Sequence, residues 1–399
     1  MKETIVLVTG SEGFIGKHLM EALARRPNVR ALGCDIGNTP EELGRALEQA
    51  DVIYHLAGVN RPTDLKELES GNVDFTRSLC NSLQALGRQP TFVLSSSIQA
   101  ELDNPYGISK RQAELILQTW STMTGARCVV FRLKNVFGKW CRPNYNSVVA
   151  TFCHNIAHGL PLSISDPSKA LELVYIDDIV DAFLKVLEQH PGACGYWEIP
   201  RSFTITLGDL ADKIQSFRQS RQNLTLPSFA DDFPRYLYAT YLSYLDSQDF
   251  AYNLDIKRDD RGELAEFIKS PHAGQIFVSR TKPGITRGNH YHHTKTEKFL
   301  VIEGEALIRL RSIQPTSSGM HTNLVEYRVS GRDFRVVDIP PGYTHSIENV
   351  GSAEMVVLFW SSEIFAPGKP DTIGLPVVRE PATFERKAVA AAGEVLKGA

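Results

Sequence analysis

The chain has 399 residues, of which 42% are hydrophobic and 22% are charged, and its formal net charge is −3. A chain of this length can bury large cores in two or three domains. The small net charge, with both signs mixed along the chain, gives no reason to expect a nucleic-acid or membrane-surface partner. No run of about 18 apolar residues is present, so membrane insertion is not expected.

Cysteine usage and the first residues bear on where the protein works. The six cysteines are scattered and form no Cys-x-x-Cys pair. The chain passes directly into an apolar strand, without the pattern of a signal peptide. We therefore expect a cytoplasmic protein whose thiols are reduced.

The first chemical signal is a glycine-rich turn that follows an apolar strand at residues 4–9. The turn, Gly10-Ser-Glu-Gly-Phe-Ile-Gly16, opens a helical pattern. Glycines at this spacing let the backbone approach a pyrophosphate at a helix N-terminus, where free N–H groups favour negative charge. The turn therefore predicts a dinucleotide site.

Strand-like and helix-like segments alternate from residue 1 to about residue 190. This alternation predicts a doubly wound parallel sheet of the Rossmann type, with helices on both faces. Further strands are expected at 29–35, 52–56, 91–95, 128–133 and 171–175, and helices at 14–26, 40–50, 73–87, 107–125, 146–158, 178–189 and 207–220. The aromatic-rich segment 236–244 is interpreted as a linker to the second half of the chain.

A tyrosine and a lysine four residues apart, Tyr106 and Lys110, would lie on one face of a helix. A neighbouring ammonium favours the phenolate and lowers the pKa of the phenol. Such a phenol can donate a proton to a carbonyl oxygen as hydride reaches the carbon. A serine at the end of the strand before this helix can orient that oxygen, with Ser97 preferred by its position and Ser96 in reserve.

These features, in this order, resemble the extended short-chain dehydrogenase/reductase superfamily, with Ser97, Tyr106 and Lys110 as its catalytic residues. An unrelated surface tyrosine–lysine pair is the alternative. The residues expected to bind the dinucleotide are Gly10, Gly13, Phe14, Ile15, Gly16, Asp35, Leu56, Ala57, Gly58, Tyr106 and Lys110.

From about residue 251 the chain changes to short strands separated by Gly and Pro-Gly turns, which is typical of an all-β barrel. His290 and His292 would point to the same face of a strand. With Glu297 and His345 they form a set of three imidazoles and one carboxylate, ligands that suit zinc, iron, nickel or manganese.

The segments 284–304 and 340–349 resemble the two motifs of the cupin family, although Phe334 stands where the second motif usually has a glycine. The resemblance implies a jelly-roll barrel that holds Zn²⁺ or another divalent transition metal. His293 and Tyr343 flank the ligands and are candidates for a general base, although His293 would point away from the metal on a regular strand. A metal-free cupin is the alternative.

Stretches in both halves, up to about residue 377, resemble one family of bifunctional UDP-sugar enzymes of capsular polysaccharide synthesis. They are 55–62, 94–100, 103–107, 137–141, 143–148 and 260–262. The resemblance implies that a zinc cupin epimerises C3 of a UDP-4-keto-6-deoxy-N-acetylhexosamine. It implies that the N-terminal domain reduces the 4-keto group with NADPH, on the route to UDP-N-acetyl-L-fucosamine for surface polysaccharide such as capsule or O-antigen. It also implies a homodimer.

One residue departs from this expectation about the cofactor. Asp35 ends the second predicted strand, where a carboxylate accepts hydrogen bonds from a ribose 2′-OH and repels a 2′-phosphate. NADPH is favoured by the resemblance, and NADH stays open because of Asp35.

Candidates for binding the UDP-sugar come from both halves. Those in the N-terminal half lie where the reductase superfamily contacts its nucleotide sugar, and those in the barrel include a turn that in sugar-nucleotide cupins brings an arginine to the diphosphate. They are Arg132, Asn135, Asn146, Arg261 and Arg287. A polar network under the sheet, or surface salt bridges, would explain the same residues.

The expected domains are a reductase domain at 1–248, a cupin at 249–377 and a tail of uncertain structure at 378–399, with a separate core in each domain. No acidic residue directly follows Ser97, which disfavours a 4,6-dehydratase. Two alternatives remain: a non-catalytic sensor, and a single-function 4-epimerase or reductase with a structural cupin. Intact catalytic and metal residues favour the bifunctional enzyme.

Overall fold

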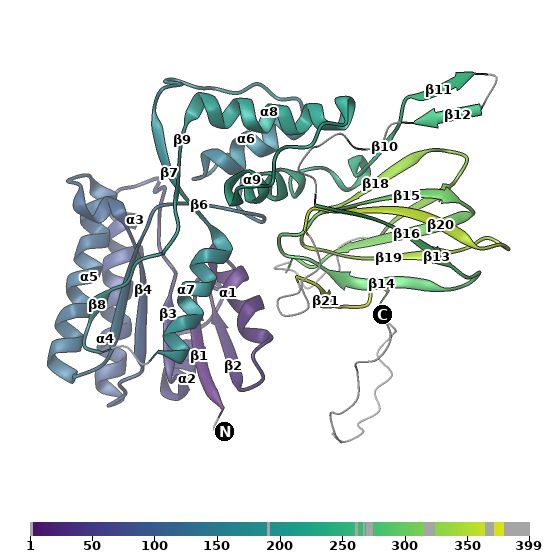
Figure 1. The fold of residues 1–399 in the computed structure, drawn as a ribbon. Coiled ribbons are helices and arrows are strands. Elements are labelled where there is room, and N and C mark those ends of the chain that lie inside the picture. The colour runs from purple at the N-terminus through teal and green to yellow at the C-terminus, as the bar shows by residue number, and fades with distance from the viewer. Residues whose placement is uncertain are drawn as a thin grey trace, which may run out of the picture.

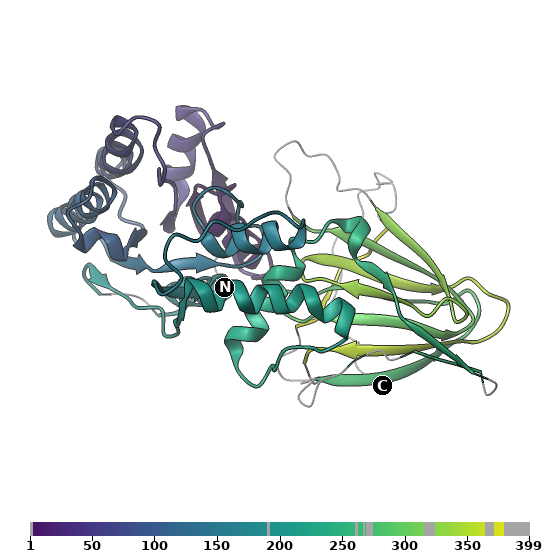
Figure 2. The same cartoon turned by 90° about the horizontal axis from the view of Figure 1, so that it is seen from above.

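The computed structural model describes residues 3–189, 192–259, 262–265, 268, 274–314, 324–363 and 371–378. An α/β half and an all-β half lie beside each other, and three helices lie at their junction (Figures 1 and 2). These helices are α6 (Val148–Ala157), α8 (Leu207–Asn223) and α9 (Asp232–Leu242).

The N-terminal half is built on a six-stranded sheet in which every neighbouring pair is parallel. The strand order is β2-β1-β3-β4-β5-β8, and the predicted parallel sheet is thereby confirmed. Its strands are β1 (Thr4–Thr9), β2 (Val29–Cys34), β3 (Val52–His55), β4 (Thr91–Ser97), β5 (Cys128–Leu133) and β8 (Gly195–Tyr196). Most central strand residues are apolar and buried, as expected for a sheet covered on both faces.

Helices cover the two faces of this sheet. One face packs against α1 (Phe14–Ala24) and α7 (Ile176–Glu188) through Leu19, Leu23 and Phe183. The other face packs against α2 (Pro40–Gln49), α4 (Phe75–Ala85) and α5 (Pro105–Thr124). Since β1 lies between β2 and β3, the crevice at the carboxyl end of β1 is the place where such sheets bind ligands.

A smaller sheet, β6-β7-β9, continues the N-terminal half toward the barrel. Its strands are β6 (Asn135–Phe137), β7 (Ala170–Tyr175) and β9 (Phe203–Thr206). Short helical segments complete this half and the junction: α3 (Lys66–Leu68), the π-helix η1 (Glu69–Asp74), η2 (Ile98–Glu101) and η3 (Ser247–Asp249). The helix expected at 73–87 therefore begins as a π-helix before it continues as α4.

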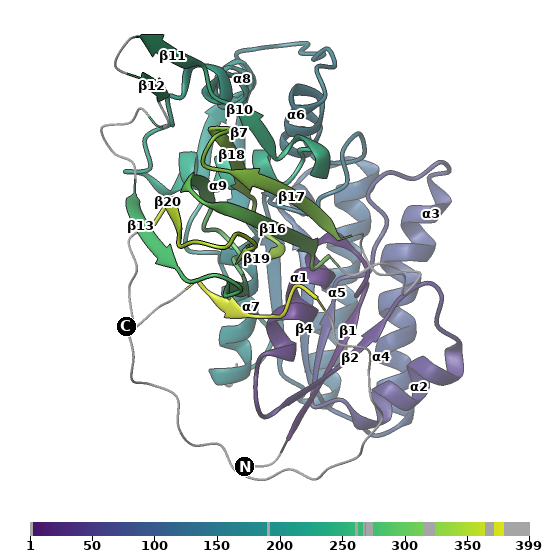
Figure 3. The same ribbon diagram turned by 90° about the vertical axis from the view of Figure 1, so that its right-hand side faces the viewer.

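The C-terminal half consists of two packed five-stranded antiparallel sheets, which confirms a cupin-like β domain (Figure 3). One sheet contains β10 (Ala251–Asn253), β18 (Arg335–Ile339), β15 (Glu297–Glu303), β20 (Met355–Ser361) and β13 (Gln275–Thr281). The other contains β17 (Val325–Ser330), β16 (Glu305–Ser312), β19 (Tyr343–Asn349), β14 (Thr286–Tyr291) and β21 (Ile373–Gly374). A separate hairpin of β11 (Ile256–Asp259) and β12 (Gly262–Ala265) projects from the barrel (Figure 1).

The interpretation of 236–244 as a linker was wrong, because most of it forms the C-terminal part of helix α9. Every residue from Tyr236 to Leu242 is buried. A helix buried on all sides shows no polar face, so its sequence lacks the alternation that identifies a surface helix.

The expectation of two separate cores was also wrong. One cluster of buried apolar side chains runs from Phe137 and Phe152, through Tyr238 and Tyr241 of α9, to Trp360 in the barrel. Phe229 lies against Trp360, with ring centroids 5.9 Å apart. Cutting the chain near residue 250 would therefore expose apolar surface on both fragments.

Two expectations fall on residues that the structure does not describe. They are the substrate-binding role of Arg261 and the conformation of the tail beyond residue 378. Within the described ranges, the helices are all too short or too polar to cross a bilayer.

Candidate functional site

The glycine turn after β1 is shaped by close backbone contacts. Gly10 has φ +71°, and a Cβ on it would lie 2.7 Å from the backbone nitrogen of Ala57. A Cβ on Gly16 would lie 2.0 Å from the carbonyl oxygen of Gly10. Helix α1 begins directly after Gly13, so its free N–H groups face the crevice beyond β1. The turn fits a pyrophosphate, because only glycines allow this approach.

The turn after β3 closes the other side of this crevice. The N–H groups of Leu56 and Ala57 donate to the carbonyl and the hydroxyl of Thr9, at 3.1 and 3.4 Å. Asn72 in the π-helix accepts the N–H of Val59 at 2.9 Å and donates to Ser109 at 3.0 Å. Asn72 was not predicted, because no local pattern in the sequence marks a residue in a π-helix.

Ser97 ends β4, and Tyr106 and Lys110 lie one turn apart near the start of α5. The Ser97 side chain lies close enough to the Tyr106 phenol to lower its pKa. Lys110 is only 6% exposed, and a Cβ on Gly58 would lie 3.6 Å from its Nζ. The ammonium therefore lies beside the turn that would hold the dinucleotide.

The pKa values in this group differ from the expectation. Burial raises the pKa of Tyr106, and only the neighbouring Ser97 side chain opposes this shift. Burial lowers the pKa of Lys110 to about 8, although the charge of Glu114 acts against this shift. The expected lowering of the tyrosine pKa by Lys110 is not found, because burial is the largest influence on the phenol.

Ser96, the reserve candidate, has a different role from Ser97. Its hydroxyl donates to the buried carboxylate of Glu114. Arg132 donates to the same carboxylate through Nε and Nη2, at 3.0 and 2.6 Å, and to Glu101 at 2.8 Å. This network favours a structural role for Ser96 and Arg132 over a substrate contact.

The other proposed substrate residues are dispersed. Asn135 is exposed at the start of β6 and donates to the carbonyl of Glu172 at 3.1 Å. Asn146 is exposed in the loop before α6. Arg287 donates to the Thr281 hydroxyl at 3.0 Å, which ties β14 to the end of β13. None of these contacts tests substrate binding.

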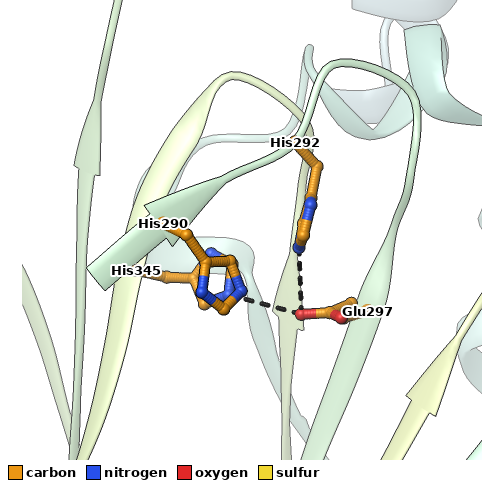
Figure 4. Close-up of side chains that lie close together, drawn as sticks. All are labelled: His290, His292, Glu297 and His345. Carbon is orange, nitrogen blue, oxygen red and sulfur yellow. Dashed lines mark ion pairs between the residues drawn. The ribbon is translucent and has the colours of Figure 1, made fainter. Parts of the chain in front are cut away.

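The predicted metal ligands meet inside the barrel (Figure 4). Strands β14 and β19 pair so that His290 lies opposite His345, while Glu297 begins β15 in the facing sheet. One ligand atom from each of the four residues lies within 4.8 Å of every other. The Nε2 atoms of His292 and His345 each lie 3.3 Å from Oε2 of Glu297.

The electrostatics of this cluster suit a cation. Burial and the neighbouring imidazoles lower the pKa of His290 to about 4, so its ring is neutral at pH 7. Burial alone would raise the pKa of Glu297, but its contacts with His292 and His345 hold it well below its usual value. Nε2 of His292 and of His345 is buried and has no hydrogen-bond partner in the described part of the chain. Buried imidazole nitrogens that lack a hydrogen-bond partner, beside a carboxylate, suit a zinc-like ion.

The two candidate bases differ in where they point. His293 faces the N-terminal half, where its ring nitrogens lie 3.2 Å from a Glu21 oxygen and from Nζ of Lys139. This placement favours a domain contact over catalysis. Tyr343 lies two residues before His345, on the same face of β19, and its ring packs edge-on against Phe250 at 5.0 Å.

Helix α1 connects the two candidate sites. Near its C-terminal end Glu21 accepts a hydrogen bond from Tyr291, the residue between the ligands His290 and His292. Arg25 contacts both Glu21 and His293. Lys139, which is only 1% exposed, lies beside His293 and completes this contact between the two halves. The sequence analysis quoted Lys139 only within a family motif, since nothing in its spacing indicates an interdomain role.

Comparisons with known proteins match both halves of the chain. Residues 6–195 match the family model described as the NAD dependent epimerase/dehydratase family. Residues 257–373 match the model of the polysaccharide biosynthesis C-terminal domain. The two matches correspond to the α/β half and to most of the barrel.

Individual relatives cover nearly the whole chain. UDP-2-acetamido-2,6-β-L-arabino-hexul-4-ose reductase of Pseudomonas aeruginosa is 42% identical over 376 residues, which are 93% of this chain and 98% of that protein. The crystal structure of the capsular polysaccharide assembling protein CapF from Staphylococcus aureus aligns with a TM-score of 0.63 and 43% identity, covering 94% of this chain and 100% of CapF. GDP-6-deoxy-D-mannose reductase of Pseudomonas aeruginosa is 29% identical over 224 residues, 48% of this chain and 73% of that enzyme. The similarity at this identity and coverage, together with the two sites in one chain, shows that the chain belongs to the family of UDP-2-acetamido-2,6-β-L-arabino-hexul-4-ose reductases.

Proposed function

We propose that the chain is a bifunctional nucleotide-sugar enzyme of surface-polysaccharide synthesis. Its barrel epimerises C3 of a UDP-4-keto-6-deoxy-N-acetylhexosamine, and its N-terminal half reduces the 4-keto group with a nicotinamide dinucleotide. The single observation that carries this proposal is the presence of two complete sites in one chain. The placement of Ser97 beside Tyr106, with buried Lys110 one turn further along α5, supports reduction, and the cluster of three imidazoles and Glu297 supports epimerisation.

In the reduction, Tyr106 is the proton donor to the ketone oxygen, and Ser97 orients the same oxygen. A bound reduced nicotinamide supplies the hydride. The raised pKa of Tyr106 keeps its phenol protonated at neutral pH, which is the form needed to give a proton. Buried Lys110 lies one turn from Tyr106 on α5, with its ammonium beside Gly58, where its positive charge would help to hold the dinucleotide.

In the epimerisation, a base must remove the C3 proton next to the C4 ketone. His290, His292, Glu297 and His345 would hold a divalent ion, which when bound stabilises the negative charge that develops on the ketone oxygen. His293 faces helix α1, which leaves Tyr343, on the strand face of His345, as the remaining candidate. Burial raises the pKa of Tyr343, so its protonated phenol suits the proton donor of the epimerisation better than the base. His292, Glu297 and His345 are buried, while His290 is partly exposed near the end of β14, whose preceding residues Thr286–Asn289 are exposed.

Two measurements on the full chain test the proposal. Addition of a UDP-4-keto-6-deoxy-N-acetylhexosamine should cause the absorbance of the reduced nicotinamide to fall, at a rate on the order of one turnover per second or faster. In D₂O without the dinucleotide, the same substrate should gain one deuterium at C3. A protein that binds both ligands but shows neither reaction would instead be a sensor. Reduction without deuterium uptake would indicate a single-function reductase with a structural barrel.

The structure bears on the choice between NADH and NADPH. Asp35 is not turned away from the cofactor crevice, since its Oδ2 accepts the N–H of Glu12 in the glycine turn at 2.9 Å. Its Oδ1 accepts the N–H of Ile36 at 2.8 Å, so both oxygens are held. No lysine or arginine occurs between Thr9 and Gly16 or between Ala31 and Leu43. We therefore propose NADH as the preferred cofactor.

Substituting Asp35 should change this preference. Asp35→Arg replaces a charge that repels the 2′-phosphate with one that attracts it, so the NADPH/NADH ratio of kcat/KM should rise by roughly tenfold or more. Fluorescence titration of the dinucleotides should show the same change in Kd without any sugar. Glu12→Gln is the matched control, because it alters a neighbouring exposed acid but keeps the Asp35 contact through its backbone N–H. A parent enzyme that binds NADPH more tightly than NADH would contradict the assignment.

A further inference from the structure

The loop between the ligands His292 and Glu297 is held by one carboxylate from far along the chain. Asp371 accepts the N–H of His293 at 2.9 Å, and the N–H groups of Thr294 and Lys295 at 2.8 Å each. It also accepts the Thr294 hydroxyl at 3.0 Å. Three of the four residues between the two ligands thereby donate their backbone N–H groups to a single side chain.

The backbone of the same residue contacts a ligand directly. The carbonyl oxygen of Asp371 is hydrogen-bonded to Nδ1 of His292. A carbonyl only accepts, so Nδ1 carries a proton, and in the neutral ring the lone pair is then on Nε2. Nε2 is the atom that faces Glu297 in the cluster.

The segment that carries Asp371 is itself fixed against the ligand strands. Strand β21 pairs with the end of β14, placing Gly374 opposite His290. Beyond β21, the N–H of Leu375 donates to the carbonyl of Asn289 at 2.8 Å. Arg311 donates to the carbonyls of Pro376 and Val377 at 2.8 Å. Residues 371–377 therefore form a strap across the ligand-bearing edge of the barrel, and we call them the C-terminal strap.

We propose that Asp371 is a positioning residue of the metal centre. Its backbone carbonyl fixes the ring orientation and tautomer of His292, and its carboxylate fixes the loop that leads to Glu297. This inference rests on the proposed metal-dependent function of the barrel. Hydrogen bonds from residues outside the ligand set orient the ligands, and losing them usually weakens metal binding by about 10- to 100-fold. Asp371 itself lies outside the ligand cluster.

The test uses the full chain and zinc alone. Zinc Kd should be measured by competition with a chelator for the parent, Asp371→Ala and Asp371→Asn proteins. Asp371→Ala removes every carboxylate contact, so we expect a Kd about 10- to 100-fold higher than that of the parent. Asp371→Asn keeps one acceptor oxygen, so its zinc Kd should lie between those of the parent and Asp371→Ala. The visible spectrum of Co²⁺-loaded protein should also change, because it reports the ligand geometry.

A second readout separates positioning from a merely structural role. Zinc raises the Tm by an amount that depends on its Kd, so this rise should shrink in the variants. A residue that only stabilises the fold would lower the Tm equally with and without zinc and leave Kd unchanged. Asp333→Ala is the matched control, because Asp333 likewise accepts from a backbone N–H and a hydroxyl, both of Ser330, at 3.2 and 3.0 Å in a turn without ligands.

The outcomes distinguish this inference from the proposed function. Weaker zinc binding in the Asp371 variants, with the Asp333 control unchanged, would support the inference. A parent that binds zinc while both variants keep its Kd would overturn the positioning role alone. If Asp371→Ala does not fold, Asp371→Asn with unchanged Kd and Co²⁺ spectrum is sufficient to overturn it. A parent that holds no metal would overturn both the inference and the epimerase.

Discussion

Replacing Tyr106 by phenylalanine is expected to slow ketone reduction by roughly 10²-fold or more, the usual contribution of a general acid. The ring stays in place, while the hydroxyl beside Ser97 is lost. Dinucleotide binding should persist, because Gly10, Gly13 and Gly16 are unchanged. The reduction is measured by nicotinamide absorbance, and binding is measured separately by fluorescence titration.

The same variant also separates the two reactions within an intact chain. Deuterium uptake at C3 should continue in Tyr106→Phe, because enolisation in the barrel needs no hydride. Tyr54→Phe is the matched control, since the Tyr54 hydroxyl donates to the carbonyl of Phe183 in the core at 2.6 Å, away from the crevice. Normal turnover by Tyr106→Phe would refute its role, and loss of deuterium uptake would show that the barrel depends on the reductase site.

The secondary structure of the N-terminal half was predictable because its signals are local. Strand β5 was predicted with its observed bounds, and α2, α6 and α7 within two residues at each end. Helix α2 shows why: Thr39 and Glu42 form a capping box and Pro40 opens the helix. Periodicity failed at α9, because a helix between two domains is apolar on every side.

The candidate ligand set of the barrel was predictable because its signal is also local in the sequence. The residues that support the ligands were not predictable. Alternate residues of a strand share a face, so the spacing of His290 and His292 indicated a common target, although β14 ends at Tyr291, just before His292. Asp371 lies 79 residues from His292 and reaches it only through the pairing of β21 with β14. The contact of Glu21 with Tyr291 spans 270 residues. Contacts made by tertiary packing leave no pattern in a single sequence.

Truncation is a poor test of this molecule because the core is continuous between its halves. The cluster that includes Phe137 and Trp360 has no boundary near residue 250. A fragment that lost activity could have lost it by unfolding. Point substitutions at the two sites are therefore the sharper experiments, and each can be scored by the reaction that it should leave intact.

The double substitution His290→Ala with His292→Ala is expected to remove the metal and stop deuterium uptake at C3. Elemental analysis of the parent should find close to one transition metal per chain, with zinc expected, and the variant should hold none. Stabilisation of a developing oxyanion by a metal is worth several kcal/mol, so we expect C3 exchange to fall by about 10³-fold or more. Reduction of an already epimerised ketone should persist, since the residues of the N-terminal site are untouched.

A second histidine pair in the chain provides the control. His154 and His158 lie one turn apart on and just after α6, with ring centroids 4.2 Å apart, and such an exposed pair could bind zinc adventitiously. Converting both to alanine should leave the metal content and the C3 exchange unchanged. Metal retained in full by the His290/His292 variant would refute the ligand assignment. Exchange that survives complete removal of the metal would show that the barrel is not the epimerase, because enolisation would then proceed without the Lewis acid on which its mechanism depends.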